Sequence, residues 1–145
     1  MYSIILCKNN TPGSVFLRVM MWSKWSHSAI LDHEHNMVYD AAMLQGGVKK
    51  HDFHTWIKKY PDARHVEYRL IEVKDIEAAR AWLEAQRGKK YDWTAVVAFP
   101  FRQDWRCELK WFCSEMTEAF RTLFSTPIFR ADASRITPHH QDIVI

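Results

Sequence analysis

Cys113 is the residue whose surroundings in the sequence best suit nucleophilic chemistry. Apolar side chains recur at helical spacing over 113–124, so we expect the thiol in the first turn of a buried helix that ends before Pro127. The face of this helix predicted to point inward comprises Met116, Ala119, Phe120, Leu123 and Phe124. Unpartnered backbone N–H groups there stabilise a thiolate and can lower a cysteine pKa from ~8.5 to roughly 3.5–7.5. A lone cysteine is also a common small core residue, so the thiol indicates catalysis only with partners nearby.

His27 and Asp40 are the partners that such a thiol needs. Each interrupts an apolar run, 26–31 and 37–43, and the polar connection between these runs indicates a β-hairpin. A loop of two or four residues would put both side chains on one face of the sheet. Histidine is the usual base for a thiol, and a carboxylate on its far nitrogen orients the ring and supports its charge. A Cys–His–Asp set follows if the Cys113 helix packs on this sheet.

The other elements follow from alternation, capping residues and chain breakers. Glycine and proline are scarce, and a length of 145 residues suits a single domain over 1–145. Strands are predicted at 2–7, 26–31, 37–43, 48–53, 65–73 and, as an edge strand, in the tail 137–145. Helices are predicted at 14–24, 55–60, 76–87 and 113–124. Between the last two helices we expect an apolar segment at 90–101 and a polar loop at 102–110. Helix 14–24 carries a wide apolar face. This order of elements predicts the α+β class rather than alternating βαβ units.

Four short motifs together resemble a known family. They are His27-Ser28-Ala29-Ile30, Val38-Tyr39-Asp40-Ala41, Lys90-Tyr91-Asp92-Trp93 and Phe112-Cys113-Ser114-Glu115. With the histidine strand before the cysteine helix, they look like the circularly permuted papain-like fold of the permuted NlpC-type cysteine hydrolases and, more distantly, of the lecithin:retinol acyltransferase-like enzymes. The resemblance implies a small antiparallel sheet packed by helices, with Cys113 as nucleophile, His27 as general base and Asp40 as the third polar residue. Ala29 stands where many members have glycine, and Asp40 where Glu, His or Gln is common.

By this resemblance we expect a cysteine-dependent hydrolase or acyltransferase that forms an acyl-enzyme on Cys113. Its substrate would contain an amide bond, in a peptide or peptidoglycan-type peptide, or an ester bond, and no cofactor is needed. The backbone N–H of Cys113 is a natural oxyanion donor, with Ser26 and Tyr91 as candidates for a second one. One alternative is a papain-like module that binds a partner, such as a host protein, without catalysis. A metal-binding protein is the less favoured alternative.

Other functional classes find little support in the composition. The formal charge of +3 is small, its basic pairs are scattered, and the seven tryptophans fall in different elements, so we expect no nucleic-acid surface. The eight histidines match no zinc-binding spacing, so we expect no metal. Those considered as ligands are His33, His35, His51, His54, His139 and His140.

The sequence also bears on where the protein acts. No secretory signal opens the chain, and the longest apolar run, 93–101, is about half of the ~20 residues that cross a bilayer. Three cysteines without a CxxC motif suit a reducing compartment. We therefore expect a cytoplasmic protein without a transmembrane segment, and a cellular, phage or mobile-element origin fits equally.

Overall fold

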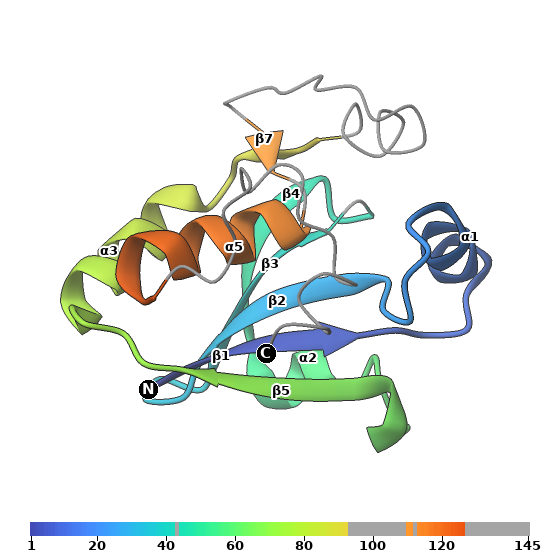
Figure 1. Cartoon of the computed structure of the whole chain (residues 1–145), viewed down its shortest axis with the longest axis horizontal. Helices are drawn as coiled ribbons and strands as arrows, with labels where there is room; N and C mark the ends of the chain where they lie inside the picture. The colour runs from blue at the N-terminus through green and yellow to red at the C-terminus, as the bar shows by residue number, and fades with distance from the viewer. Residues whose placement is uncertain (43, 93–109, 112, 127–145) are drawn as a thin grey trace.

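A computed structural model of the chain describes residues 1–42, 44–92, 110–111 and 113–126. At its centre lies a seven-stranded sheet with the strand order β5-β1-β2-β3-β4-β6-β7 (Figure 1). The strands are β1 (Tyr2–Cys7), β2 (His27–Asp32), β3 (Met37–Ala42), β4 (Gly47–Asp52), β5 (Val66–Ile71), β6 (Lys90–Tyr91) and β7 (Lys110–Trp111). Neighbouring strands run antiparallel, except β6 and β7, which run parallel.

Helices pack on both faces of this sheet (Figure 1). Among the described residues they are α1 (Pro12–Met20), α2 (Phe53–Ile57), α3 (Ile76–Gln86) and α5 (Cys113–Phe124), with a 3-10 turn η1 (Ala63–His65). Helix α5 packs against β2, β3 and α3, whereas α2 packs against β3 and β4. The α+β class expected from the sequence is confirmed.

The side chains of β1 alternate between two apolar clusters on opposite faces of the sheet. Leu6 belongs to the cluster that contains Phe120 of α5, whereas Cys7 belongs to the cluster that contains Trp56 of α2. Every residue of β1 is buried, so this strand is internal on both faces. Such double burial explains why the run 2–7 contains so few polar residues.

Capping side chains start two of the helices, at the residues that the sequence indicates. Thr11 accepts a hydrogen bond from the N–H of Ser14 at the start of α1. Asp75 accepts one from the N–H of Ala78, at 2.9 Å, at the start of α3. The predicted helix at 14–24 is shorter in the structure, because the chain leaves the helix after Met20.

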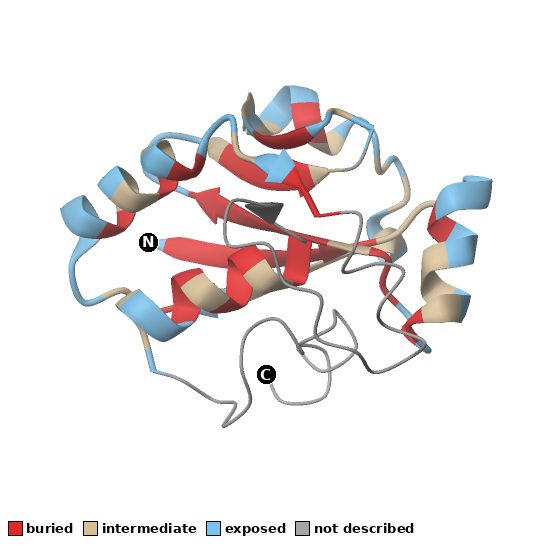
Figure 2. Ribbon diagram, turned by 90° about the horizontal axis from the view of Figure 1, so that it is seen from above, coloured by how far each residue is buried: buried red, intermediate tan, exposed pale blue. Residues whose placement is uncertain are grey.

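Two apolar patterns mislead about burial. Leu123 of α5 was expected to face inward but is 60% exposed. Met116 and Phe120 of the same predicted face are buried in the core, so Leu123 lies at its edge, and the buried side of α5 also includes the ion pair of Glu118 with Arg121. The apolar face of α1 is also largely exposed, as Figure 2 shows at the right of the view.

Some predicted features lie outside the described residues: the apolar segment 93–101, the polar loop with Cys107, and the edge strand in the tail 137–145. No helix in the described part of the chain has both the length and the apolar character needed to cross a bilayer.

Candidate active site

The β2–β3 hairpin brings His27 and Asp40 together. Its loop covers residues 33–36, one of the two lengths that put both side chains on the same face. Ala29 pairs with Asp40, so His27, two residues earlier on β2, lies diagonally across from the carboxylate. The Nε2 atom of His27 is 3.3 Å from Oδ2 of Asp40. The sequence therefore predicted this contact correctly.

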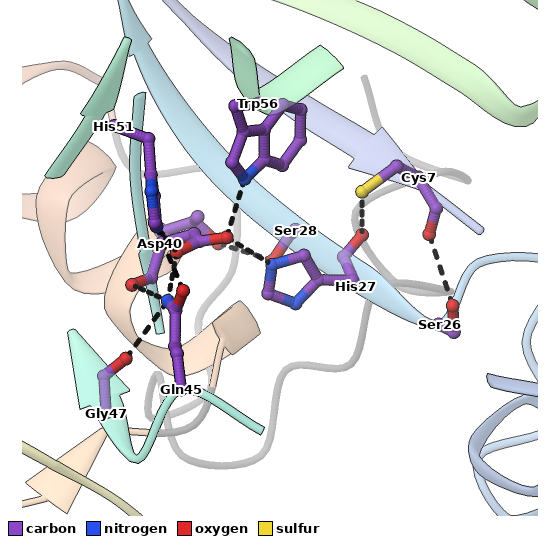
Figure 3. A network of polar contacts seen from close by, with 10 residues as sticks. Cys7, Ser26, His27, Ser28, Asp40, Gln45, Gly47, His51 and Trp56 are labelled. Carbon is purple, nitrogen blue, oxygen red and sulfur yellow. Dashed lines mark hydrogen bonds and ion pairs between the residues drawn. The ribbon is translucent and has the colours of Figure 1, made fainter. Parts of the chain in front are cut away.

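Asp40 is the centre of a buried network of polar side chains (Figure 3). Its side chain is 2% exposed, and Nε1 of Trp56 donates a hydrogen bond to Oδ2 at 2.7 Å. The other oxygen, Oδ1, accepts a hydrogen bond from Nε2 of Gln45 and lies 3.3 Å from Nε2 of His51. Gln45 in turn accepts a hydrogen bond from His51 through Oε1, at 2.9 Å. Both carboxylate oxygens are thus satisfied, as a buried carboxylate requires.

These contacts shift the pKa values of His27 and Asp40 in opposite directions. Burial raises the pKa of Asp40, but the hydrogen bonds with His27, His51 and Trp56 outweigh it and hold that pKa well below its usual range. Burial lowers the pKa of His27, but the hydrogen bonds with Asp40 and Cys113 and the charges of both groups raise it to about 10. At neutral pH the pair is therefore an imidazolium and a carboxylate.

The sheet opens at the end where His27 lies. The pairing of β2 with β3 ends at Ala29 and Asp40, whereas the pairing of β2 with β1 continues to His27 and Cys7. In Figure 1, β3 accordingly diverges from β2 at this end. The His27 side chain is 14% exposed at this end of the sheet.

Cys113 reaches this opening because α5 is attached to the start of β2. Ser28 Oγ and Thr117 Oγ1 are 3.2 Å apart, and Thr117 lies one helical turn after Cys113. The Cys113 side chain is buried and its hydrogen bond and charge contribute to the raised pKa of His27. All three residues predicted from the sequence thus meet at the same end of β2.

The two candidates for a second oxyanion donor differ in the structure. The hydroxyl of Ser26 lies 2.7 Å from the hydroxyl of Ser14 and also donates to the carbonyl of Cys7, so it holds α1 against the sheet. Tyr91 is buried in the same apolar cluster as Cys113. Burial, followed by the charge of Cys113, raises the pKa of Tyr91 well above its usual value, so its hydroxyl keeps its proton. Since Ser26 bonds to Ser14 and Cys7, we keep Tyr91 as the candidate for the second donor.

Trp56, Gln45 and His51 belong to the site but were not predicted as members of it. Asp52 caps α2 by accepting a hydrogen bond from the N–H of Thr55 at 2.9 Å. The cap fixes the start of α2, the helix that carries Trp56 to Asp40. The cap is visible in the sequence, but the position of α2 beneath Asp40 is not. His51 was considered as a metal ligand, and the register of β4 with β3 instead directs it to Asp40.

A second polar group has the composition of a metal site. Asp32, Glu34 and His35 are the residues, within the described ranges, whose ligand atoms lie within 4.8 Å of one another. Arg80 donates to Asp32 at 3.2 Å and to Glu34 at 2.6 Å, so one guanidinium already pairs with both carboxylates. The group is therefore an ion-pair cluster. The other described histidines considered as ligands contact polar side chains: His33 with Ser3, His51 with Gln45 and His54 with Asn36.

The fold and the site define an α+β protein with a cysteine, a histidine and an aspartate gathered at one end of a sheet. Neither a known protein family nor a curated protein matches this sequence. Its function is therefore argued from the residues of the site.

Proposed function

We propose that the protein is a thiol hydrolase or acyltransferase that acts on an amide or ester bond. The observation that carries the proposal is the 3.3 Å contact between His27 and Asp40, at the end of β2 on which the first turns of α5 pack. An imidazolium held by a carboxylate favours the thiolate form of a neighbouring cysteine. The chain order, with the histidine strand before the cysteine helix, is that of the permuted papain-like fold and supports the same proposal.

The proposed reaction begins with His27 as an imidazolium, since its pKa of about 10 keeps the ring charged at neutral pH, and with Cys113 as the thiolate that such a neighbour favours. The thiolate attacks the carbonyl carbon, an S–C bond forms, and the C=O electrons move to the oxygen. The backbone N–H of Cys113 and the hydroxyl of Tyr91 stabilise this oxyanion. The tetrahedral intermediate then expels the amine or alcohol, which takes the proton from His27.

The same groups release the acyl group in the second half of the reaction, with His27 now acting first as a base. Neutral His27 removes a proton from water, or from an acceptor alcohol or amine, as its oxygen or nitrogen attacks the thioester carbonyl. The C–S bond breaks, and the thiolate and the imidazolium form again. Asp40 keeps Nε2 of His27 occupied throughout, so Nδ1 is the nitrogen that exchanges the proton with Cys113 and the substrate.

This chemistry serves peptide amides, peptidoglycan-type peptides and esters, and it requires no cofactor. The mass of an adduct trapped on Cys113 from a mixture of such substrates identifies the acyl group.

We also propose a cytoplasmic place of action, because Cys7 and Cys113 are both free thiols and a reducing compartment preserves them. A phage or mobile-element origin of the protein is compatible with this cytoplasmic place of action.

Alkylation of the cysteines tests the activated thiol. A limiting amount of iodoacetamide is added at mildly acidic pH, and the labelled peptides are quantified by mass spectrometry. We expect Cys113 to react much faster than Cys7, because burial raises the pKa of Cys7 far above its usual value. Equal rates for the two cysteines, in the folded protein, would overturn the proposal. A hydrolysis assay gives a second test: wild-type turnover by both Cys113→Ala and His27→Ala would also overturn the proposal.

A catalytically silent binding module is the second candidate function. It is favoured by the burial of Cys113, which is 1% exposed in the structure. Under this alternative the thiol is a core residue, and it is labelled no faster than Cys7. The alkylation experiment therefore decides between the two candidates.

A further inference from the structure

The first helix carries an apolar surface that the described part of the fold leaves exposed. Its members form one stripe, the α1 stripe, because they follow one another at helical spacing along one side of the helix. They are Val15, Phe16, Val19 and Trp22, which are 42%, 56%, 68% and 89% exposed. Figure 2 shows the outward side of α1 in pale blue and tan, in contrast to the red of the neighbouring strands. The opposite side of the helix is attached to the protein through Ser14 and Met21, which are buried.

Trp22 has a backbone conformation that is unusual for a bulky residue. Its φ angle is 49°, in the left-handed region. The N–H of Trp22 bonds to the carbonyl of Val19, and the N–H of Ser23 bonds to that of Arg18. This is a Schellman ending, in which glycine usually takes the left-handed position because a bulky residue there is strained. The indole also gains little from packing, since it is the most exposed member of the α1 stripe.

The surroundings of the α1 stripe are basic. Residues 1–31 include Lys8, Arg18 and Lys24 and contain no aspartate or glutamate. The ammonium groups of Lys8 and Lys24 lie 5.6 and 4.6 Å from the ring centre of Trp25, just after α1. At the adjoining end of β5, the nearby carboxylates are paired with arginines: Asp62 with Arg64 and Glu67 with Arg69. The surface around α1 is therefore complementary to an anionic partner.

We propose that the α1 stripe docks on a membrane surface that contains anionic lipids. A helix that lies in such a surface has tryptophan and phenylalanine on one side and basic residues beside them. Anionic headgroups attract lysine and arginine near the surface, which supplies the charge complementarity. Each of these features is present around α1.

The topology relates this surface to the candidate active site. Helix α1 follows Cys7 at the end of β1 and precedes His27 at the start of β2, and these two residues are paired (Figure 1). Docking through α1 would therefore hold the His27 end of the sheet close to the lipid surface. The inference goes beyond the proposed thiol chemistry and does not depend on it, because it concerns binding alone.

Co-sedimentation of the full chain with vesicles tests the proposal. One set of vesicles contains equal parts of phosphatidylcholine and phosphatidylserine, and the other contains phosphatidylcholine alone. We expect the wild-type protein to bind the anionic vesicles at least ~10-fold more strongly, because two or three basic residues near the surface contribute an effect of that order. Replacing Lys24→Gln should weaken this binding, whereas Lys49→Gln, an exposed lysine on β4, should not.

The apolar contribution is tested with V19S/W22S, whose changes are both on exposed side chains and so are compatible with folding. We expect this variant to bind anionic vesicles at least ~10-fold more weakly, because burial of large apolar side chains in the interface is worth a factor of that order. The matched control is Leu70→Ser on β5, since Leu70 is 65% exposed and Val19 is 68% exposed. Circular dichroism verifies that each variant is folded.

Three outcomes would overturn the proposal: equal binding to both kinds of vesicle, no binding to either, or wild-type binding by V19S/W22S. Self-association of the wild-type chain that V19S/W22S abolishes would also overturn it, because the α1 stripe would then be an interface between protein copies. Failure of the thiol chemistry is recognised separately. In that case hydrolysis of a soluble substrate is absent without vesicles, while vesicle binding is unchanged.

Discussion

Two buried aspartates on the same hairpin are held in different ways. Asp32, at the end of β2, bonds to Arg80, and Asp40, on β3, contacts His27 and His51. Burial raises the pKa of both carboxyl groups, and in both cases the hydrogen bonds with the partners outweigh it and lower the pKa. Both carboxylates thus stay ionised at neutral pH, but Asp32 is paired with a guanidinium and Asp40 with an imidazolium.

The difference separates a structural site from a chemical one. A guanidinium keeps its proton under all ordinary conditions, so the pair of Asp32 and Arg80 can only hold the hairpin against α3. An imidazole can give up and regain its proton, so the pair of His27 and Asp40 can take part in catalysis. A buried carboxylate therefore becomes informative about function through the identity of its partner.

Removal of the His27 imidazole should have the largest effect. We expect His27→Ala to lower kcat/KM by about 10²- to 10⁴-fold, the usual contribution of a general acid and base. The control is His35→Ala, because His35 makes the corresponding contact to Asp32, at 3.3 Å between Nδ1 and Oδ2. Steady-state kinetics on the same substrate compare the two variants. An equal loss of kcat/KM in both variants would contradict the assignment of Asp40 to catalysis and of Asp32 to structure.

Asp40→Asn should change the pH dependence of activity. The carboxylate supports the His27 pKa of about 10, and its neutralisation should lower this pKa by about 1–3 units. Because protonated His27 donates to the leaving group, the basic limb of the kcat/KM profile should move to lower pH. Asp32→Asn is the matched control, and its basic limb should stay in place. A limb that is unchanged in Asp40→Asn would show that Asp40 does not act through His27.

The same pair should also stabilise the fold in a pH-dependent way. The pKa of His27 is raised to about 10 from an unfolded value of about 6.5. Its stabilising contribution is therefore complete below that unfolded value and is lost as the pH rises through about 10. Thermal unfolding of the wild type across this range should show the loss, and in Asp40→Asn the loss should be smaller and should occur at lower pH.

Trp56→Phe tests how much a single hydrogen bond to Asp40 contributes to stability. A smaller aromatic ring remains, but the bond from Nε1 to Asp40 at 2.7 Å is removed, and this loss should lower the free energy of unfolding by about 1.5–3 kcal/mol beyond the change in packing. Trp25→Phe is the matched control, because Trp25 is equally buried and its Nε1 has no acceptor among the described residues. Urea unfolding measures both variants, and a similar loss for the two would assign the effect to packing.

Asp32→Asn should weaken the fold and leave the chemistry intact. We expect the melting temperature to fall by roughly 2–4 °C at neutral pH, because water partly screens the contact with Arg80. The pKa of Asp32 is lowered, so its contribution is present above the unfolded value of about 3.9 and is lost as the pH falls. The difference from the wild type should therefore shrink in acid. A difference that persists at low pH would rule out the ion pair as its source.

His51→Gln should have the smallest effect. His51 contacts Asp40 on the oxygen that does not face His27, so it positions the carboxylate and does not exchange protons with the substrate. Loss of this hydrogen bond should lower kcat/KM by roughly 2- to 10-fold and leave KM nearly unchanged. His54→Gln, whose ring contacts Asn36 instead, should behave as the wild type.

Much of the candidate site could be predicted because its first contact is local. The apolar runs on either side of a short polar connection indicate a hairpin, and a four-residue loop sets which side chains share a face. His27 and Asp40 are therefore paired by the register of a single hairpin. Their catalytic role is still a prediction, which the alkylation and kinetic experiments test.

The sequence by itself determined strands β1 to β5, the caps Thr11 and Asp75 and the diagonal contact of His27 with Asp40, because periodicity and loop length act within a few residues. The two-residue strands β6 and β7 were not predicted, since they form only by pairing with distant parts of the chain. Only the tertiary structure decided that Trp56, Gln45 and His51 surround the same carboxylate, since their approach depends on how α2 and β4 pack against β3. The exposure of Leu123 and of the α1 stripe was decided in the same way. An apolar pattern shows that a helix has two faces, but the neighbours supplied by the rest of the chain determine which face is covered.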